Sequence, residues 1–99
     1  MLKIKSEYPD LDKYESFGVI YYYKKYTFMT HNPYVPAFIS KDKVIEYWIE
    51  NKLHRLDGPA RIFKNGNEEY WINNEYLTKE DFQLQSLKLL NKEYLISLL

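Results

Sequence analysis

The chain has 99 residues, of which 45% are apolar and 18% aromatic, so it suits one small folded domain and not a disordered protein. Its 14 basic and 14 acidic residues balance, which argues against a protein held to nucleic acid or to a membrane mainly by net charge. There is no cysteine, which excludes disulfide bonds, thiolate metal sites and cysteine nucleophiles.

The first 30 residues have the composition of strands. Leu2 and Ile4 alternate with lysines and indicate a short edge strand. Residues 17–31 are rich in tyrosine and β-branched residues and predict two more strands, with a turn near Lys24-Lys25. This segment reads as a degenerate copy of the repeat described next only if two residues are inserted.

A repeat with a period of 23 residues occupies the middle of the chain. Residues 31–49, HNPYVPAFISKDKVIEYWI, align without a gap on residues 54–72, HRLDGPARIFKNGNEEYWI. A fixed period of this length indicates structural units of one kind that stack on each other. We therefore divide the single domain into residues 1–30, repeat 1 (31–53), repeat 2 (54–77) and a C-terminal helical segment (78–99).

Each repeat predicts a β-hairpin. Asn65-Gly66 in repeat 2 is a strong signal for a type I′ turn with a two-residue loop. That register places Ala60 opposite Trp71 and, in repeat 1, Ala37 opposite Trp48. The pairing indicates that each alanine leaves room for an indole, and a bulge at the turn would shift it by one residue.

Asparagines mark the turns between hairpins. Asn51 and Asn74 are expected there because asparagine tolerates the left-handed backbone region. The resulting fold class is α+β: an antiparallel β-meander of five to seven short strands, followed by one or two C-terminal helices.

The C-terminal segment has a helical period. Thr78 is the expected N-cap, and Asn91 is a point at which the segment divides if it forms two helices. Either the helix lies between two layers, or its second apolar stripe meets a partner. The first stripe is Leu84, Leu87, Leu90, Tyr94, Leu95 and Leu98, and the second is Phe82, Leu89 and Ile96.

With the stretch HRLDGPARIFKNGNEEYWINNEYLTKEDF laid out in this way, residues 54–82 resemble short tandem repeats of the MORN-variant type. In that family a His-Arg-x-Asp-Gly-Pro-Ala start precedes an Asn-Gly or Asp-Gly turn and a Tyr-Trp strand. Residues 31–53 resemble it less, because HNPYVPA lacks the Arg, Asp and Gly. The resemblance implies a ladder of β-hairpins closed by a helix, an origin among phage, bacterial or giant-virus proteins, and no catalytic residue.

The repeat motif contains the most suggestive polar cluster. His54, Arg55 and Asp57 have the chemistry to bind an anion or move a proton. The alternative, which we favour, is structural: Asp57 caps the turn, and Arg55 pairs with it or lies over Trp71. The residues assigned to this structural motif are His54, Arg55, Asp57, Gly58, Pro59, Ala60 and Trp71.

The two histidines recur at the repeat period. As metal ligands, His31 and His54 would need a carboxylate partner, and none is spaced to supply it. We therefore expect no metal and no other cofactor.

A segment of tyrosines and lysines is the main candidate for partner binding. If the strand alternates, Tyr21 and Tyr23 share one face and Tyr22 lies on the other, so one set belongs to the core. Aromatic rings among lysines also stack on bases in single-strand binders. The candidate residues are Tyr21, Tyr22, Tyr23, Lys24, Lys25 and Tyr26, together with Phe82, Leu89 and Ile96.

These patterns favour a non-catalytic, cytoplasmic protein-binding module with no membrane span, since no nucleophile or phosphate-loop motif is present. The resemblance implies a phage or mobile-element accessory protein that inhibits a bacterial target, such as a CRISPR-type defence nuclease. Two alternatives stay open. One is binding of RNA or single-stranded DNA through residues 21–26. The other is a self-associating unit, a homodimer with Phe82, Leu89 and Ile96 at a twofold contact.

Overall fold

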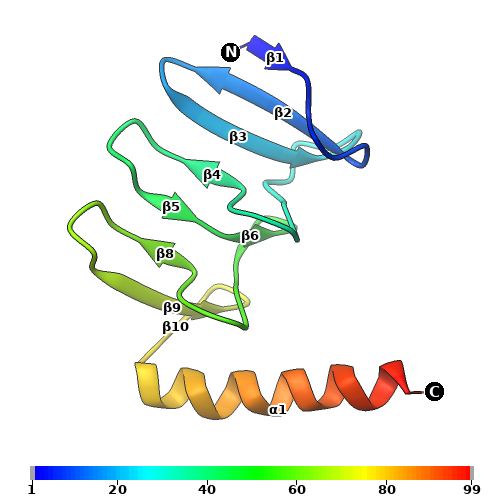
Figure 1. Ribbon diagram of the computed structural model, residues 1–99, viewed down its shortest axis with the longest axis vertical. Helices are drawn as coiled ribbons and strands as arrows, with labels where there is room; N and C mark the ends of the chain where they lie inside the picture. Colours follow the sequence, from blue (N-terminus) through cyan, green and yellow to red (C-terminus); the bar gives the residue numbers. More distant parts are fainter. Residues whose placement is uncertain (1, 99) are drawn as a thin grey trace.

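Figure 1 shows the computed structural model of the protein, in which residues 2–98 are described. Antiparallel strands lead into one C-terminal helix, which confirms the predicted α+β meander. The described residues form ten strands and not five to seven, because each repeat carries a second, very short hairpin. The elements are β1 (Leu2–Ile4), β2 (Leu11–Ser16), β3 (Val19–Lys24), β4 (Phe38–Ile39), β5 (Ile45–Glu46), β6 (Trp48–Ile49), β7 (Lys52–Leu53), β8 (Arg61–Ile62), β9 (Glu68–Ile72), β10 (Glu75–Leu77) and α1 (Lys79–Ser97).

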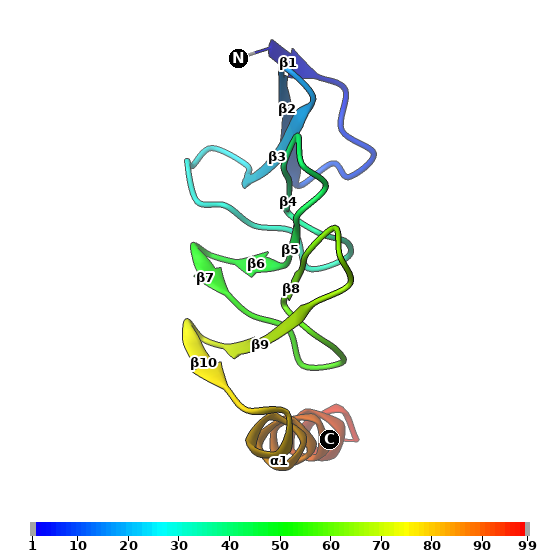
Figure 2. The ribbon, with the colours of Figure 1, turned by 90° about the vertical axis from the view of Figure 1, so that its left-hand side faces the viewer.

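The main sheet has eight strands in the order β1-β2-β3-β4-β5-β8-β9-β10, and β6 pairs only with β7. Three hairpins lie side by side in this sheet, and α1 runs across the end formed by β9 and β10 (Figure 1). The molecule measures 39 × 37 × 18 Å. Its small depth, visible in Figure 2, means that the sheet is a single layer over most of its area.

The long hairpin of repeat 2 has a three-residue loop, so the predicted two-residue turn is wrong. The Phe63 amide donates to the Asn67 carbonyl oxygen at 2.9 Å, and the Gly66 amide donates to the Phe63 carbonyl oxygen at 2.9 Å. Gly66 has a positive φ of 89°, whereas Asn65 does not. This is the pattern of a type I turn followed by a G1 bulge.

The bulge shifts the strand register by one residue. Arg61 lies opposite Glu69 in repeat 2, and Phe38 lies opposite Glu46 in repeat 1. The predicted pairing of Ala60 with Trp71 therefore does not form. The same shift removes the predicted pairing of Ala37 with Trp48.

The two alanines are small for a different reason. Ala37 and Ala60 are completely buried where one hairpin meets the next. The Tyr22 amide donates to the Ala37 carbonyl oxygen and the Tyr47 amide to that of Ala60, each at 2.8 Å. Close approach of neighbouring backbones leaves room for a methyl group only.

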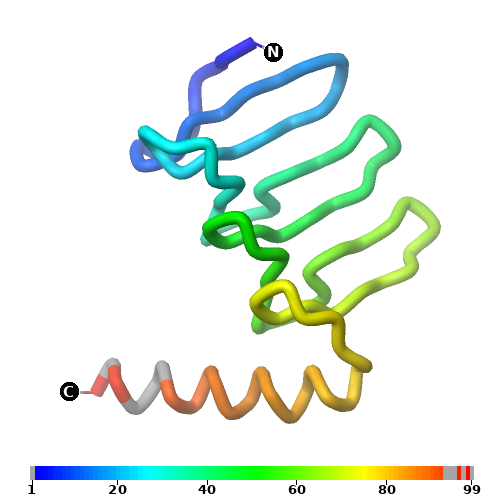
Figure 3. The backbone as a smooth tube through the Cα atoms, turned by 180° about the vertical axis from the view of Figure 1, so that it is seen from behind, coloured from blue at the N-terminus to red at the C-terminus, as the bar shows by residue number. Residues whose placement is uncertain are grey.

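Type I′ turns occur in the short hairpins instead, where both central residues have positive φ: Glu50 and Asn51 in repeat 1, Asn73 and Asn74 in repeat 2. The prediction that Asn51 and Asn74 adopt the left-handed region is confirmed, with φ of 65° and 67°. Figure 3 shows these turns one below the other along the side of the stack.

The turn asparagines also tie each repeat to the preceding chain. The side-chain oxygen of Asn51 accepts the Thr30 amide, and that of Asn74 accepts the Leu53 amide, each at 2.7 Å. The amides of the two asparagines donate back to the carbonyl oxygens of the same residues, at 2.9 and 3.0 Å. Thr30 and Leu53 are themselves 23 residues apart, so the connection between layers repeats with the sequence.

The hairpin β2–β3 follows the same hydrogen-bonding plan. The His31 amide donates to the Tyr22 carbonyl oxygen, as the His54 amide does to that of Tyr47. Tyr22 thus takes the place of Tyr47, two residues further from it than the 23-residue period. Residues 25–28 account for the difference, because this loop has four residues where repeat 1 has two.

The helix is a single element, and Asn91 does not divide it. The Thr78 hydroxyl oxygen accepts the Asp81 amide at 3.1 Å, so the predicted N-cap is confirmed. Among the described residues, no helix combines the length and the hydropathy needed to cross a membrane.

The helix turns its second apolar stripe toward the sheet, which is the reverse of the predicted roles. Phe82 is 6% exposed in a cluster with Ile72 and Leu77, and Leu89 packs against that cluster. Phe82 and Leu89 are therefore not a free surface for a partner, whereas Ile96 is exposed. Of the first stripe, Leu84, Leu87, Leu90 and Leu98 are exposed, and the side chains of Tyr94 and Leu95 lie outside the described residues.

The two long-hairpin loops give a stability prediction. Lys43 stands at the position of Gly66 and has a φ of 64°, a conformation that costs an L-residue about 1–2 kcal/mol. Lys43→Gly is therefore expected to stabilise the protein by about 1 kcal/mol and to raise Tm by about 4–8 °C. Gly66→Lys is the matched control and should lower Tm by a similar amount. An unchanged or lower Tm for Lys43→Gly in a thermal melt would contradict the assigned loop.

Candidate functional site

One row of side chains crosses the sheet from β2 to β9. Successive strand pairings place these residues directly opposite one another, so all of them lie on the same face. The first three are aromatic and the last three are charged. In order across the sheet, the row is Tyr14, Tyr21, Phe38, Glu46, Arg61 and Glu69.

The aromatic half of the row widens into a cluster of five rings, here called the aromatic patch: Tyr14, Tyr21, Tyr23, Phe28 and Phe38. The Tyr21 ring meets the Phe38 ring edge to face at a centroid distance of 5.1 Å, and Tyr14 meets Tyr23 at 5.5 Å. Tyr23 also lies 6.3 Å from Tyr21 and 6.2 Å from Phe28. The tyrosines and Phe38 are half-buried, and Phe28 is 85% exposed.

The environment of the patch is partly desolvated. Burial raises the pKa of the Tyr23 hydroxyl, and the neighbouring Tyr21 and Tyr14 hydroxyls raise it further. Adding a partner over these rings would complete the removal of water that their mutual contacts begin.

The predicted tyrosine–lysine segment divides between the two faces of β3. Tyr21 and Tyr23 belong to the aromatic patch, whereas Tyr22 is only 4% exposed in a core cluster with Leu11 and Ala37. The Tyr22 hydroxyl donates to a carboxylate oxygen of Glu7 at 2.6 Å. Tyr22 is therefore a core residue and does not belong in the partner-binding set.

The remaining residues of that segment lie at its exposed end. The Lys24 ammonium pairs with Glu50 at 3.0 Å, and this neighbour holds the pKa of the Glu50 carboxyl below its usual range. The Lys25 ammonium lies 5.8 Å from the ring centre of Tyr26, which is itself exposed. Lys24 thus has an internal partner, while Lys25 and Tyr26 face solvent.

The charged half of the row links the two repeats. Arg61 donates from Nε to Glu46 at 2.7 Å and from Nη1 to Glu69 at 2.9 Å. These carboxylates also accept the indole N–H groups of Trp48 and Trp71, at 2.9 and 3.1 Å. Because Glu46 and Glu69 are repeat counterparts, one arginine joins the same position of both copies.

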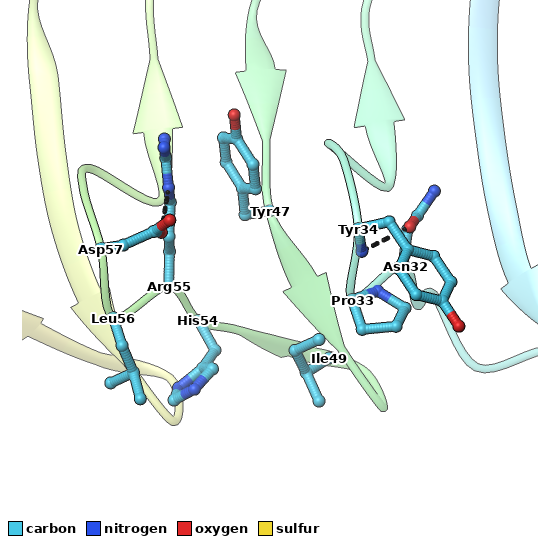
Figure 4. Close-up of a pocket in the computed structure, with 9 residues that line it drawn as sticks. All are labelled: Asn32, Pro33, Tyr34, Tyr47, Ile49, His54, Arg55, Leu56 and Asp57. Carbon is cyan, nitrogen blue, oxygen red and sulfur yellow. Dashed lines mark hydrogen bonds and ion pairs between the residues drawn. The ribbon is translucent and has the colours of Figure 1, made fainter. Parts of the chain in front are cut away.

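A cavity of about 490 Å³ lies beside the start of the two repeat motifs (Figure 4). The Arg55 guanidinium lies 4.1 Å from the Tyr47 ring centre, and its Nε pairs with Asp57 at 2.8 Å. Its Nη1 donates to the Pro59 carbonyl oxygen at 3.2 Å. The cavity is lined by Asn32, Pro33, Tyr34, Tyr47, Ile49, His54, Arg55, Leu56 and Asp57.

These contacts fit the structural reading of the motif. Arg55 pairs with Asp57 as predicted and lowers the pKa of that carboxyl, but it stacks on Tyr47 and not on Trp71. The cation near Trp71 is Arg61, at 5.6 Å from the ring centre.

Gly58 completes the motif by leaving space for the arginine. A Cβ atom at this position would lie 2.8 Å from Cζ of Arg55. In repeat 1 the counterparts of Arg55 and Gly58 are Asn32 and Val35, so a shorter side chain accompanies a larger neighbour. The buried Asn32 closes its own loop by accepting the amides of Tyr34 and Val35, at 2.9 and 3.2 Å.

The histidines have the same role in both repeats. Nδ1 of His31 accepts the Glu50 amide at 3.0 Å, and Nδ1 of His54 accepts the Asn73 amide at 3.1 Å. Each imidazole therefore supports a short type I′ turn. Within residues 2–98, no group of three or more histidine, aspartate or glutamate side chains is placed to hold a metal ion.

The His31 bond makes stability depend on pH. Burial lowers the pKa of His31, and nearby Lys24 lowers it further, so the folded state disfavours protonation. This stability is fully present above the ordinary histidine pKa of about 6.5 and is lost as the pH falls through the folded pKa. We expect His31→Gln to lower the urea midpoint near neutral pH and to reduce its decline toward about pH 5.5. An unchanged pH profile in the variant would contradict this role.

Three members of the aromatic patch were missed by the sequence analysis: Tyr14, Phe28 and Phe38. Their grouping depends on the register, which the three-residue loop sets. Only the alternation that puts Tyr21 and Tyr23 on one face was available as a local signal.

Comparison with protein families, with curated proteins and with solved structures finds no match to this chain. The resemblance of residues 54–82 to MORN-variant repeats therefore stays a prediction. The functional argument depends on the surfaces described above.

Proposed function

We propose that the protein is a non-catalytic binding module and that its partner is another protein, which contacts the aromatic patch. The observation that carries the proposal is a set of five touching rings on one face of a single-layer sheet, with Phe28 standing 85% exposed at its margin. Aromatic residues are enriched in the cores of protein interfaces, because they bury a large area and lose little conformational entropy.

The charges around the patch favour a protein over a nucleic acid. Three cations on or beside this face are paired with carboxylates: Lys3 with Asp12, Lys24 with Glu50, and Arg61 with Glu46 and Glu69. A single-strand binder combines stacking rings with a cationic groove that follows the phosphates. The carboxylates beside these rings would instead repel a phosphate backbone.

The polar cluster of repeat 2 supports a non-catalytic role. Arg55 is held by the Tyr47 ring, Asp57 and the Pro59 carbonyl group, and Nδ1 of His54 accepts a backbone amide. These contacts shape the repeat. The narrower proposal, inhibition of a bacterial defence nuclease by a phage protein, rests on the family resemblance alone.

A salt titration tests the class of partner. A protein complex formed on the immobilised chain should persist from about 0.1 M to about 0.5 M NaCl, because apolar contacts are weakly screened. A fluorescent single-stranded oligonucleotide is the probe for the alternative. Oligonucleotide binding that weakens steeply between about 50 and 200 mM salt would overturn the protein-partner proposal in favour of nucleic acid.

A further inference from the structure

The outer face of α1 carries a second apolar surface, remote from the aromatic patch. While Phe82, Ser86 and Leu89 turn toward the sheet, Leu84 and Leu87 lie on the opposite side and are 64% and 58% exposed. Figure 2 views the helix along its axis and shows that its side away from the strands is open. The terminal unit of a repeat stack normally presents a polar outer face, so these leucines need another explanation.

The outer residues recur with the spacing of a coiled-coil seam. Successive intervals of four, three and four residues separate positions 80, 84, 87 and 91, and position 98 continues the series seven residues later. A seam of this kind fits against another helix by knobs-into-holes packing. The residues at these positions are Glu80, Leu84, Leu87, Asn91 and Leu98.

We propose that this face binds the same face of a second copy of the chain, with the two helices antiparallel. The argument is charge complementarity. Asp81 and Lys88 are exposed, lie on the same flank of the seam, and form no ion pair within residues 2–98. A twofold axis between Leu84 and Leu87 places Asp81 beside the partner's Lys88, and Leu84 against the partner's Leu87. Each contact then occurs twice.

The parallel arrangement lacks this complementarity. It sets Glu80 against the partner's Glu80 within the seam and leaves Lys88 without an acidic neighbour. The antiparallel arrangement places Glu80 near the partner's Asn91, which can donate to the carboxylate. It also opposes the two helix dipoles, which is the favourable orientation.

Cysteine cross-linking tests both the contact and its direction, because the natural chain has no cysteine. Asp81→Cys and Lys88→Cys are made separately, with a size tag on one of them. Under mild oxidation the mixture should give the disulfide-linked tagged–untagged dimer in large excess over the dimers of either variant alone. Equal cross-linking in each variant alone would show a parallel pair and overturn the proposal.

A charge exchange provides the second test. In sedimentation equilibrium, Asp81→Lys and Lys88→Asp should each raise the dimer Kd by about tenfold, because two attractive contacts become repulsive. The double variant restores opposite charges and should recover the original Kd. Wild-type protein that stays monomeric at sub-millimolar concentration, or single variants with an unchanged Kd, would overturn the proposal. Neither result bears on the aromatic patch.

Discussion

Phe82→Ala is expected to lower the free energy of unfolding by about 3–5 kcal/mol, the largest effect of any single truncation considered for this protein. The Phe82 ring is 6% exposed, and its centroid lies 4.7 Å from that of Tyr70. It is also the largest side chain that α1 buries against Ile72 and Leu77. Without it, the helix keeps mainly Leu89 to hold it on the sheet. Urea unfolding followed by far-ultraviolet circular dichroism measures the change.

Leu84→Ala is the matched control on the opposite face of the same helix. Its side chain is 64% exposed, so the expected change is below about 0.5 kcal/mol when the protein is dilute. A larger loss for Leu84→Ala than for Phe82→Ala would mean that the other stripe packs on the sheet. That result would remove the proposed dimer surface.

The second large effect is expected at Gly58. Gly58→Val should destabilise the protein by about 2–3 kcal/mol, because its Cβ atom would lie 2.8 Å from Cζ of Arg55. The arginine cannot retreat without losing Asp57 and the Pro59 carbonyl group. Thermal and urea unfolding of the single variant measure this loss.

Repeat 1 supplies the compensating change. Its residues at the corresponding positions are Asn32 and Val35, so Arg55→Asn combined with Gly58→Val copies an arrangement that the protein already contains. The double variant should be more stable than Gly58→Val alone, with a coupling energy of about 1–2 kcal/mol in the double-mutant cycle. Additive losses would show that Arg55 and Gly58 do not constrain each other.

Local signals in the sequence were sufficient for the fold class. The 23-residue repeat, the left-handed asparagines Asn51 and Asn74, and the cap at Thr78 each depend on a few neighbouring residues, and the structure contains all three. The loop type was not decided in this way, because Asn65-Gly66 fits both a type I′ turn and a type I turn with a bulge. The informative residue was Lys43, which shares the left-handed position of Gly66 without being glycine.

The orientation of α1 depends on tertiary structure. Both stripes have apolar side chains, so periodicity alone does not rank them. The cap at Thr78 follows directly on β10, and this short connection directs Phe82 toward β9. The candidate site has the same limit: alternation groups Tyr21 with Tyr23, but the addition of Tyr14 and Phe38 needs the strand register.

The most direct test of the proposed function compares two exposed phenylalanines at opposite ends of one hairpin. Phe28 is 85% exposed and touches the aromatic patch, whereas Phe17 is 93% exposed at the tip of β2–β3. Quantitative affinity capture from lysate treated with nuclease would compare wild type, Phe28→Ser and Phe17→Ser, after circular dichroism shows that all three are folded. We expect one protein to be retained by wild type and by Phe17→Ser and to be lost with Phe28→Ser. Equal retention by both variants, or loss with Phe17→Ser alone, would contradict the aromatic patch as the binding surface.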